Sequence, residues 1–128
     1  MKKDNKGFSL VELIIVIAIM AVLIGILAPQ YLKYVNKSKV STDITNAQEI
    51  QAAFSAAIAD GQITAAGSQS GVGGAAITNV ENMDKFPVSR VDATQQWVVT
   101  YTLKDGVTSI TLGGDQVYPD AAPYQAAH

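Results

Sequence analysis

Hydrophobic positions divide the chain into two unlike parts. Between Phe8 and Ala28 the only polar side chains are Ser9 and Glu12. A helix of that length, rising about 1.5 Å per residue, is long enough to cross a hydrocarbon core of about 30 Å. From residue 62 onward the chain is instead rich in Gly, Thr, Ser, Gln and Asp. The pattern predicts one membrane-spanning helix and one small globular part.

Beyond Pro29 the uniformly apolar pattern becomes amphipathic. Apolar positions recur every three or four residues, as one face of a helix requires: Val40, Ile44, Ala47, Ile50 or Gln51, Phe54 and Ile58. Most polar side chains, Asp43 among them, are assigned to the other faces. A helix is therefore predicted from Phe8 to Asp60, about 80 Å long, with Gly61 ending it. Pro29 predicts a kink or a locally melted segment between Gly25 and Pro29.

The second part predicts a small antiparallel sheet. Gln95 to Leu103 alternates between two faces, with Trp97, Val99, Tyr101 and Leu103 on one of them. Asp105-Gly106 favours a turn, and Val107 to Leu112 favours a returning strand. Residues 62–93 are expected to be irregular, with at most a short helical or strand turn, because glycines interrupt every period. The tail from Asp115 is expected to form a loop or a short edge strand. The fold class predicted is α+β, with the long helix packed against the sheet.

The composition excludes several kinds of covalent bond, catalytic site and metal site. The chain has no cysteine, which excludes disulfides and thiolate sites. His128 is the only histidine, so a Ser-His-Asp triad or a two-histidine metal site cannot be built; its position is typical of a mobile terminus. Gly71-Val72-Gly73-Gly74 lacks the sequel of a phosphate loop and is assigned to a flexible or subunit-contacting loop. No basic cluster indicates nucleic-acid binding. We expect no enzyme, no cofactor and no metal.

The first residues carry the most specific motif. Lys6-Gly7-Phe8-Ser9-Leu10-Val11-Glu12-Leu13 follows a short basic leader and opens the apolar helix that ends at Pro29. This arrangement resembles the processing site of type IV pilins and of the pseudopilins of type II secretion and competence systems. The resemblance covers about the first 60 residues. It implies a leader at 1–7, a transmembrane and filament-core helix at 8–29, an amphipathic continuation at 30–61 and a globular β head at 62–128.

The resemblance also implies roles for four residues. Prepilin peptidase would cleave between Gly7 and Phe8, and the new Phe8 amine would be N-methylated. Glu12 would neutralise the Phe8 amine of a neighbouring subunit during assembly, and Pro29 would let the helix adapt to the filament. Three of them have a plainer alternative. Gly7 could be a flexible junction, and Glu12 lies one turn from the membrane surface and could snorkel to it. Pro29 could be without a special function, because prolines occur in spanning helices.

The function implied is that of a structural subunit of an extracellular type IV pilus, held in the cytoplasmic membrane by a single span before assembly. Its partners would be further copies of itself, prepilin peptidase, a platform protein and an assembly ATPase. The alternatives are a major pseudopilin of a secretion or DNA-uptake system, a membrane-anchored binding domain that keeps its leader, and a secreted protein that loses the apolar segment. The sequence does not choose between motility, adhesion, secretion and DNA uptake.

Two sets of C-terminal side chains are assigned to structural roles. Some relatives in the family use calcium, and Asp105, Asp115 and Asp120 could supply oxygen ligands, but their spacing matches no defined calcium loop. They are therefore interpreted as turn aspartates. The aromatic residues Trp97, Tyr101 and Tyr118 could be adhesive or conductive, but strand spacing favours packing.

Overall fold

A computed structural model describes residue 7 and residues 9–128. These residues form, in order, helix α1 (Leu10–Ala59), strands β1 (Gly67–Val72), β2 (Gln96–Thr102), β3 (Gly106–Leu112) and β4 (Asp115–Tyr118), and helix α2 (Ala122–Ala127). The chain divides into two compact units, Met1–Val35 and Asn36–His128. We call the second unit the head. The α+β class is confirmed.

The first unit contains the part of α1 up to Val35, and its other described residues are Gly7 and Ser9, which precede the helix. Helix α1 is continuous through Pro29, so of the two alternatives predicted between Gly25 and Pro29, a kink or a locally melted segment, the melted segment is wrong. Because proline has no N–H, the carbonyl of Gly25 lacks its usual helical donor at this point. One missing bond is tolerated within a helix whose other turns are intact.

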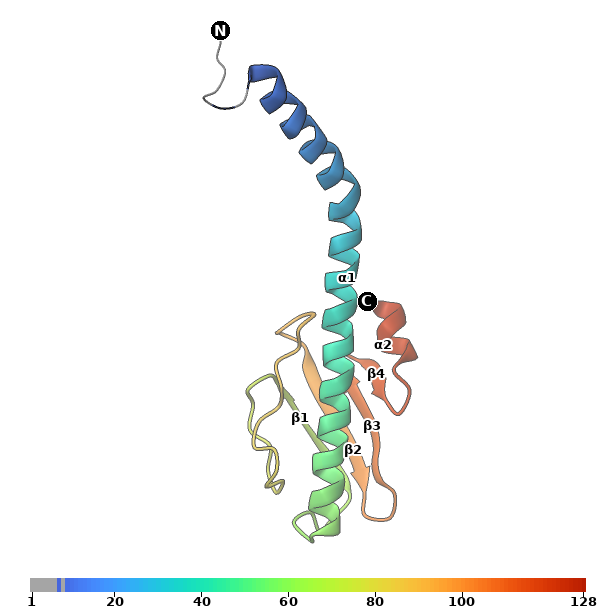
Figure 1. Cartoon of the computed structure of the whole chain (residues 1–128). Coiled ribbons are helices and arrows are strands. Elements are labelled where there is room, and N and C mark those ends of the chain that lie inside the picture. The colour runs from blue at the N-terminus through green and yellow to red at the C-terminus, as the bar shows by residue number, and fades with distance from the viewer. Residues whose placement is uncertain (1–6, 8) are drawn as a thin grey trace. The chain divides into compact units, whose positions relative to one another are not determined.

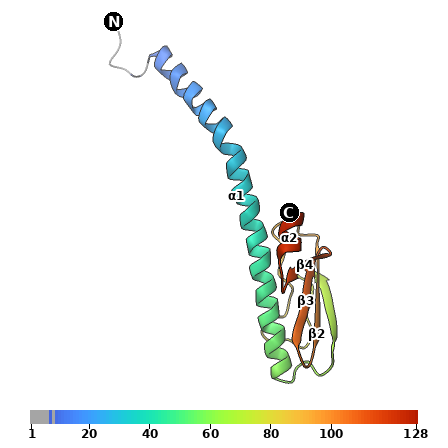
Figure 2. The same cartoon turned by 90° about the vertical axis from the view of Figure 1, so that its right-hand side faces the viewer.

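In the head, the C-terminal half of α1 lies along one face of a four-stranded antiparallel sheet of order β1-β2-β3-β4 (Figures 1 and 2). The predicted hairpin is confirmed as β2 and β3, joined at Gly106, which has a φ of 76°. Trp97, Val99 and Tyr101 of β2 point into the core, but Leu103, expected on the same face, lies beyond the strand and is 48% exposed. The predicted edge strand is β4.

The helical stripe predicted to cover the sheet is largely confirmed. Ala47, Ile50 and Phe54 of α1 are fully buried and share one core with Trp97, Ile110 and other sheet residues. Gly61, just after α1, has a φ of 79°, the left-handed conformation that commonly follows a helix. The helix and the apolar face of the sheet thus bury each other, since a hairpin alone is marginal in water.

Two elements were not predicted. Gly67–Val72 is strand β1, which pairs with β2 from Gly67 opposite Tyr101 to Val72 opposite Gln96. Its glycines give close approach: a Cβ at Gly71 would lie 2.6 Å from the Ala75 Cβ. The flexible-loop interpretation of residues 71–74 is therefore wrong for Gly71 and Val72, which belong to the sheet. The second unpredicted element is α2, which follows β4.

Candidate functional site

The N-terminal part of α1 presents apolar side chains on every side. Each large hydrophobic residue from Leu10 to Leu27 is at least 48% exposed, and so are Tyr31, Leu32 and Tyr34. By length and composition this stretch of α1 could cross a membrane. Leaving such side chains in water costs about 1.5–3 kcal/mol each relative to burial. The segment therefore needs lipid or another protein around it.

The start of α1 is capped by its own side chain. The main-chain N–H of Glu12 donates to the Ser9 hydroxyl at 3.3 Å, and the N–H of Leu13 donates to the Ser9 carbonyl at 3.1 Å. Ser9 is thus the N-cap, and Glu12 lies at the third helical position. Ser-x-x-Glu is the sequence of a capping box, and a carboxylate is favourable near the positive end of a helix. Glu12 therefore has a local stabilising role available besides any pairing with another chain.

The structure separates the residues of the predicted processing and assembly sites. Gly7 has a φ of 132°, a conformation that L side chains rarely adopt. Phe8 lies outside the described residues. Glu12 is in the first turn of α1, and Pro29 lies about 25 Å further along the helix at the standard rise. Glu12 and Pro29 therefore do not form one site within a chain, and the role proposed for each must be tested separately.

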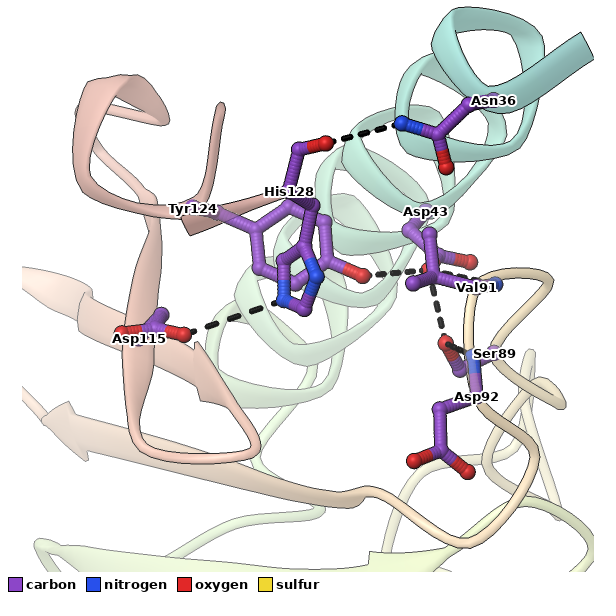
Figure 3. A network of polar contacts seen from close by, with 8 residues as sticks. All are labelled: Asn36, Asp43, Ser89, Val91, Asp92, Asp115, Tyr124 and His128. Carbon is purple, nitrogen blue, oxygen red and sulfur yellow. Dashed lines mark hydrogen bonds and ion pairs between the residues drawn. The ribbon is translucent and has the colours of Figure 1, made fainter. Parts of the chain in front are cut away.

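The head contains a polar site that the sequence analysis missed, centred on Asp43 (Figure 3). Asp43 is completely buried in the core face of α1. Its carboxylate accepts hydrogen bonds from the hydroxyls of Ser89 at 2.7 Å and Tyr124 at 2.6 Å. It also accepts from the main-chain N–H groups of Arg90 at 2.7 Å and Val91 at 3.4 Å. All four partners are donors, which is the set that an ionised carboxylate needs.

These hydrogen bonds join three segments that are distant in sequence: α1, the loop at residues 89–91, and α2. Tyr124 is completely buried as well. Burial first, and then its hydrogen bond to Asp43, raise the pKa of the Tyr124 hydroxyl well above its ordinary value. The hydroxyl therefore stays protonated and remains a donor. The carboxylate has no contact with solvent, and its hydrogen bonds hold these three segments of the head together.

A second group of contacts lies beside Tyr124. The His128 ring packs on the Tyr124 ring with centroids 4.5 Å apart, and its Nε2 lies 3.8 Å from Asp115 Oδ2. The Asn36 side-chain amide donates to the main-chain oxygen of His128 at 2.8 Å. The mobile terminus expected from the sequence is therefore wrong: residue 128 is held by α1, β4 and α2 (Figure 3).

The spacing of the apolar positions in α1 could have identified Asp43 as a core position. The buried positions of α1 are spaced by three or four residues through Val40, Asp43, Ala47, Ile50 and Phe54. Assigning Ile44 to the stripe instead gives an equally regular apolar pattern, but Ile44 is only partly buried. A carboxylate at a core position is rare without partners, and those partners come from residues 46 and more positions away.

The C-terminal aspartates take part in local contacts. Among the described residues, no group of three or more His, Cys, Asp or Glu side chains could hold a metal ion. Asp120 accepts a hydrogen bond from the main-chain N–H of Ala122, two residues on, which is a turn contact. Asp115 faces His128. Trp97 and Tyr101 are buried in the core, and the Trp97 indole N–H donates to the Pro87 carbonyl at 2.8 Å. Their packing role is confirmed.

Comparison with known proteins shows which proteins share the N-terminal part of this chain. Residues 2–28 match the family model described as the prokaryotic N-terminal methylation motif. A type IV major fimbrial protein FimA of Dichelobacter nodosus is 39% identical over 62 residues, 48% of this chain and 40% of that protein. A fimbrial protein of Pseudomonas aeruginosa is 37% identical over 60 residues, 47% of this chain and 39% of that protein. The match thus spans about two fifths of the length of these relatives. No solved structure is significantly similar.

The family match covers the basic residues before Gly7, the Ser9 cap, Glu12 and the exposed apolar helix up to Ala28. The chain therefore carries the prokaryotic N-terminal methylation motif and is homologous, over about half of its length, to type IV major fimbrial proteins.

Proposed function

We propose that this chain is a structural, non-catalytic subunit of a type IV pilus filament. The observation that carries the proposal is the apolar segment of α1, which leaves its large side chains exposed on all sides and lies in and just beyond the methylation motif. The same side chains that contact lipid tails can contact identical helices, because helix association in lipid depends on packing and not on hydrophobicity. The segment thus suits both storage in a membrane and burial in a filament core.

Assembly begins, in this proposal, with cleavage between Gly7 and Phe8 by prepilin peptidase and methylation of the Phe8 amine. An inner-membrane platform protein and an assembly ATPase then move subunits from the cytoplasmic membrane into the extracellular filament. Glu12 pairs with the Phe8 amine of a neighbouring subunit. Pro29, by removing one helical hydrogen bond, lets α1 adapt to the filament. The domain division proposed is leader 1–7, spanning helix 8–29, continuation 30–61 and globular part 62–128.

The first experiment is N-terminal sequencing and intact-mass measurement of the protein from cell membranes and from material sheared off the cell surface. A chain that begins with methylated Phe8 in the sheared fraction supports the pilus. The same terminus confined to the cell envelope supports the alternative, a pseudopilin of a secretion or DNA-uptake system. An intact Met1 terminus found only in membranes contradicts both and identifies a permanently anchored domain.

The role of Glu12 needs a variant that separates charge from helix capping. Glu12→Gln removes the charge, but glutamine is also accepted at the third position of a capping box. We expect cleavage to proceed and surface filaments to be strongly reduced, measured by shearing yield and electron microscopy. The matched control is Glu49→Gln, at an exposed position of α1, which should assemble normally. Normal filaments from Glu12→Gln would assign Glu12 to capping alone.

A further inference from the structure

Two tyrosines follow closely on the apolar segment of α1. Tyr31 and Tyr34 are 68% and 70% exposed, although each carries a large apolar ring. They are three residues apart, so they project from the same side of the helix. Both belong to the first unit, Met1–Val35, and lie outside the packed core of the head. Their rings therefore need a different partner.

Exposed lysines accompany the two tyrosines. Lys33 lies between them and Lys37 follows Tyr34 by three residues, whereas Glu12 is the only charged side chain from Leu10 to Gln30. Aromatic rings with a polar tip, next to lysines at the end of a long apolar helix, suit the boundary between lipid and water. Tyrosine keeps its ring in the apolar layer and its hydroxyl in the wet one. The positive lysines complement the anionic phosphates of that layer.

The length of helix between Glu12 and Tyr31 matches a bilayer. From one residue to the other α1 rises about 28 Å at the standard rise, and the hydrocarbon core of a membrane is about 30 Å thick. If Tyr31 lies at one boundary of that core, Glu12 lies at the other, and Gly7 lies beyond it. A shift of the helix along its axis would move Glu12 into the hydrocarbon or out into water.

We propose that Tyr31 and Tyr34, supported by Lys33, bind the phospholipid headgroup layer and fix the depth of α1 in the membrane before assembly. The rings pack against the outermost part of the acyl chains, and the hydroxyls and the Lys33 ammonium group donate to phosphate and ester oxygens. This inference rests on the proposed storage of the subunit in a membrane. It adds the contact that sets the depth, and with it the position of Glu12 at the opposite surface.

The test measures the depth of a nitroxide label on the full chain in vesicles of phosphatidylethanolamine and phosphatidylglycerol. Because the chain has no cysteine, a single label can be attached at Ile26→Cys, about 7 Å before Tyr31 along the helix. Depth is read from relaxation of the label by oxygen, which concentrates in lipid, and by a nickel complex, which stays in water. A second label, at Ala21→Cys, lies midway between Glu12 and Tyr31 and reports whether the helix spans the bilayer.

Two double variants separate interfacial binding from simple bulk. Replacement of both Tyr31 and Tyr34 by leucine keeps large apolar side chains but removes the preference for the boundary, so the hydrocarbon accepts both positions. The label at residue 26 should then move about 3 Å toward the middle of the bilayer, the rise of two helical residues. Replacement of both by tryptophan is the matched control, because tryptophan shares the preference of tyrosine for the boundary, and the depth should not change.

Each other result overturns a separate part of the reasoning. An unchanged depth in the leucine variant, or an equal shift in the tryptophan variant, overturns the tyrosine anchor; the spanning helix still stands if the label at residue 21 is shielded from the nickel complex. Contact of that label with the nickel complex, when both tyrosines are present, overturns membrane storage and the anchor with it. A leucine shift that disappears when the protein is diluted in lipid assigns the tyrosines to contacts between copies and overturns headgroup binding.

Discussion

The hydrogen bond from Tyr124 to Asp43 gives the most direct test of how the head is held together. Tyr124→Phe keeps the ring in its buried place and removes only the hydroxyl donor. The bond is 2.6 Å long and ends on a carboxylate without exposure to solvent. Hydrogen bonds to charged groups contribute about 1.5–3 kcal/mol, so the variant should lose about that much free energy of unfolding. The Asp43 carboxylate keeps its hydrogen bonds from Ser89 and the loop amides, so the head should be destabilised but still fold.

The assay is urea unfolding of the full chain in detergent micelles at pH 7, followed by the fluorescence of Trp97. Trp97 is the only tryptophan and is completely buried in the head, so its emission reports that unit. Tyr34→Phe is the control, because Tyr34 is 70% exposed on the apolar part of α1. A loss of less than about 0.5 kcal/mol in Tyr124→Phe, the size of an ordinary surface substitution, would refute the importance of the bond.

The same pair of proteins should respond differently to alkali. A free tyrosine loses its proton near pH 10, whereas burial and Asp43 raise the pKa of Tyr124 in the folded head. Above pH 10 the unfolded chain therefore binds fewer protons than the folded one, and stability falls by as much as about 1.4 kcal/mol per pH unit. Tyr124→Phe lacks this loss, so the gap between the two proteins should close above pH 10. A constant gap up to pH 11.5 would contradict the assignment.

Two further substitutions test the packing and the polar centre of the head. Gly73→Ala should destabilise the head by about 1–3 kcal/mol, because a Cβ there would lie 2.5 Å from the Val88 Cα, a main-chain atom that cannot rotate away. The control in the same urea assay is Gly25→Ala, where an added Cβ meets open space. Equal stability of the two variants would contradict the predicted clash at Gly73. Asp43→Asn should lose more free energy of unfolding than Tyr124→Phe, because the amide brings two N–H groups to face the donors that bind the carboxylate. A smaller loss than in Tyr124→Phe, measured by Trp97 fluorescence, would show that the charge is dispensable.

Repeating patterns of apolar positions, together with turn residues, predicted the main elements well. The apolar run followed by spaced apolar positions predicted one helix from Phe8 to Asp60, and α1 spans Leu10–Ala59. The alternation around Trp97 and the Asp105-Gly106 turn predicted the hairpin of β2 and β3. These features are local, because each residue and its neighbours along the chain carry the whole signal. The N-terminal methylation motif at residues 2–28 is local as well, and for that reason it could be recognised without a structure.

Features that depend on pairing with distant residues were missed. Strand β1, with the sequence Gly67–Val72, has little strand propensity, and its structure comes from pairing with β2. Helix α2 is too short to be stable alone and is held where Tyr124 reaches Asp43. The order of residue 128 is likewise supplied by Asn36 and Asp115, which lie far away in sequence.

The sequence by itself determined the long helix, its apolar N-terminal part and the hairpin, because helix period, strand alternation and turn residues act over a few positions. Only the tertiary structure decided that Asp43 faces the core, that a glycine-rich stretch forms an edge strand and that the C-terminal residues are fastened. A carboxylate can be buried only if donors from other segments reach it, and whether they do depends on the whole fold.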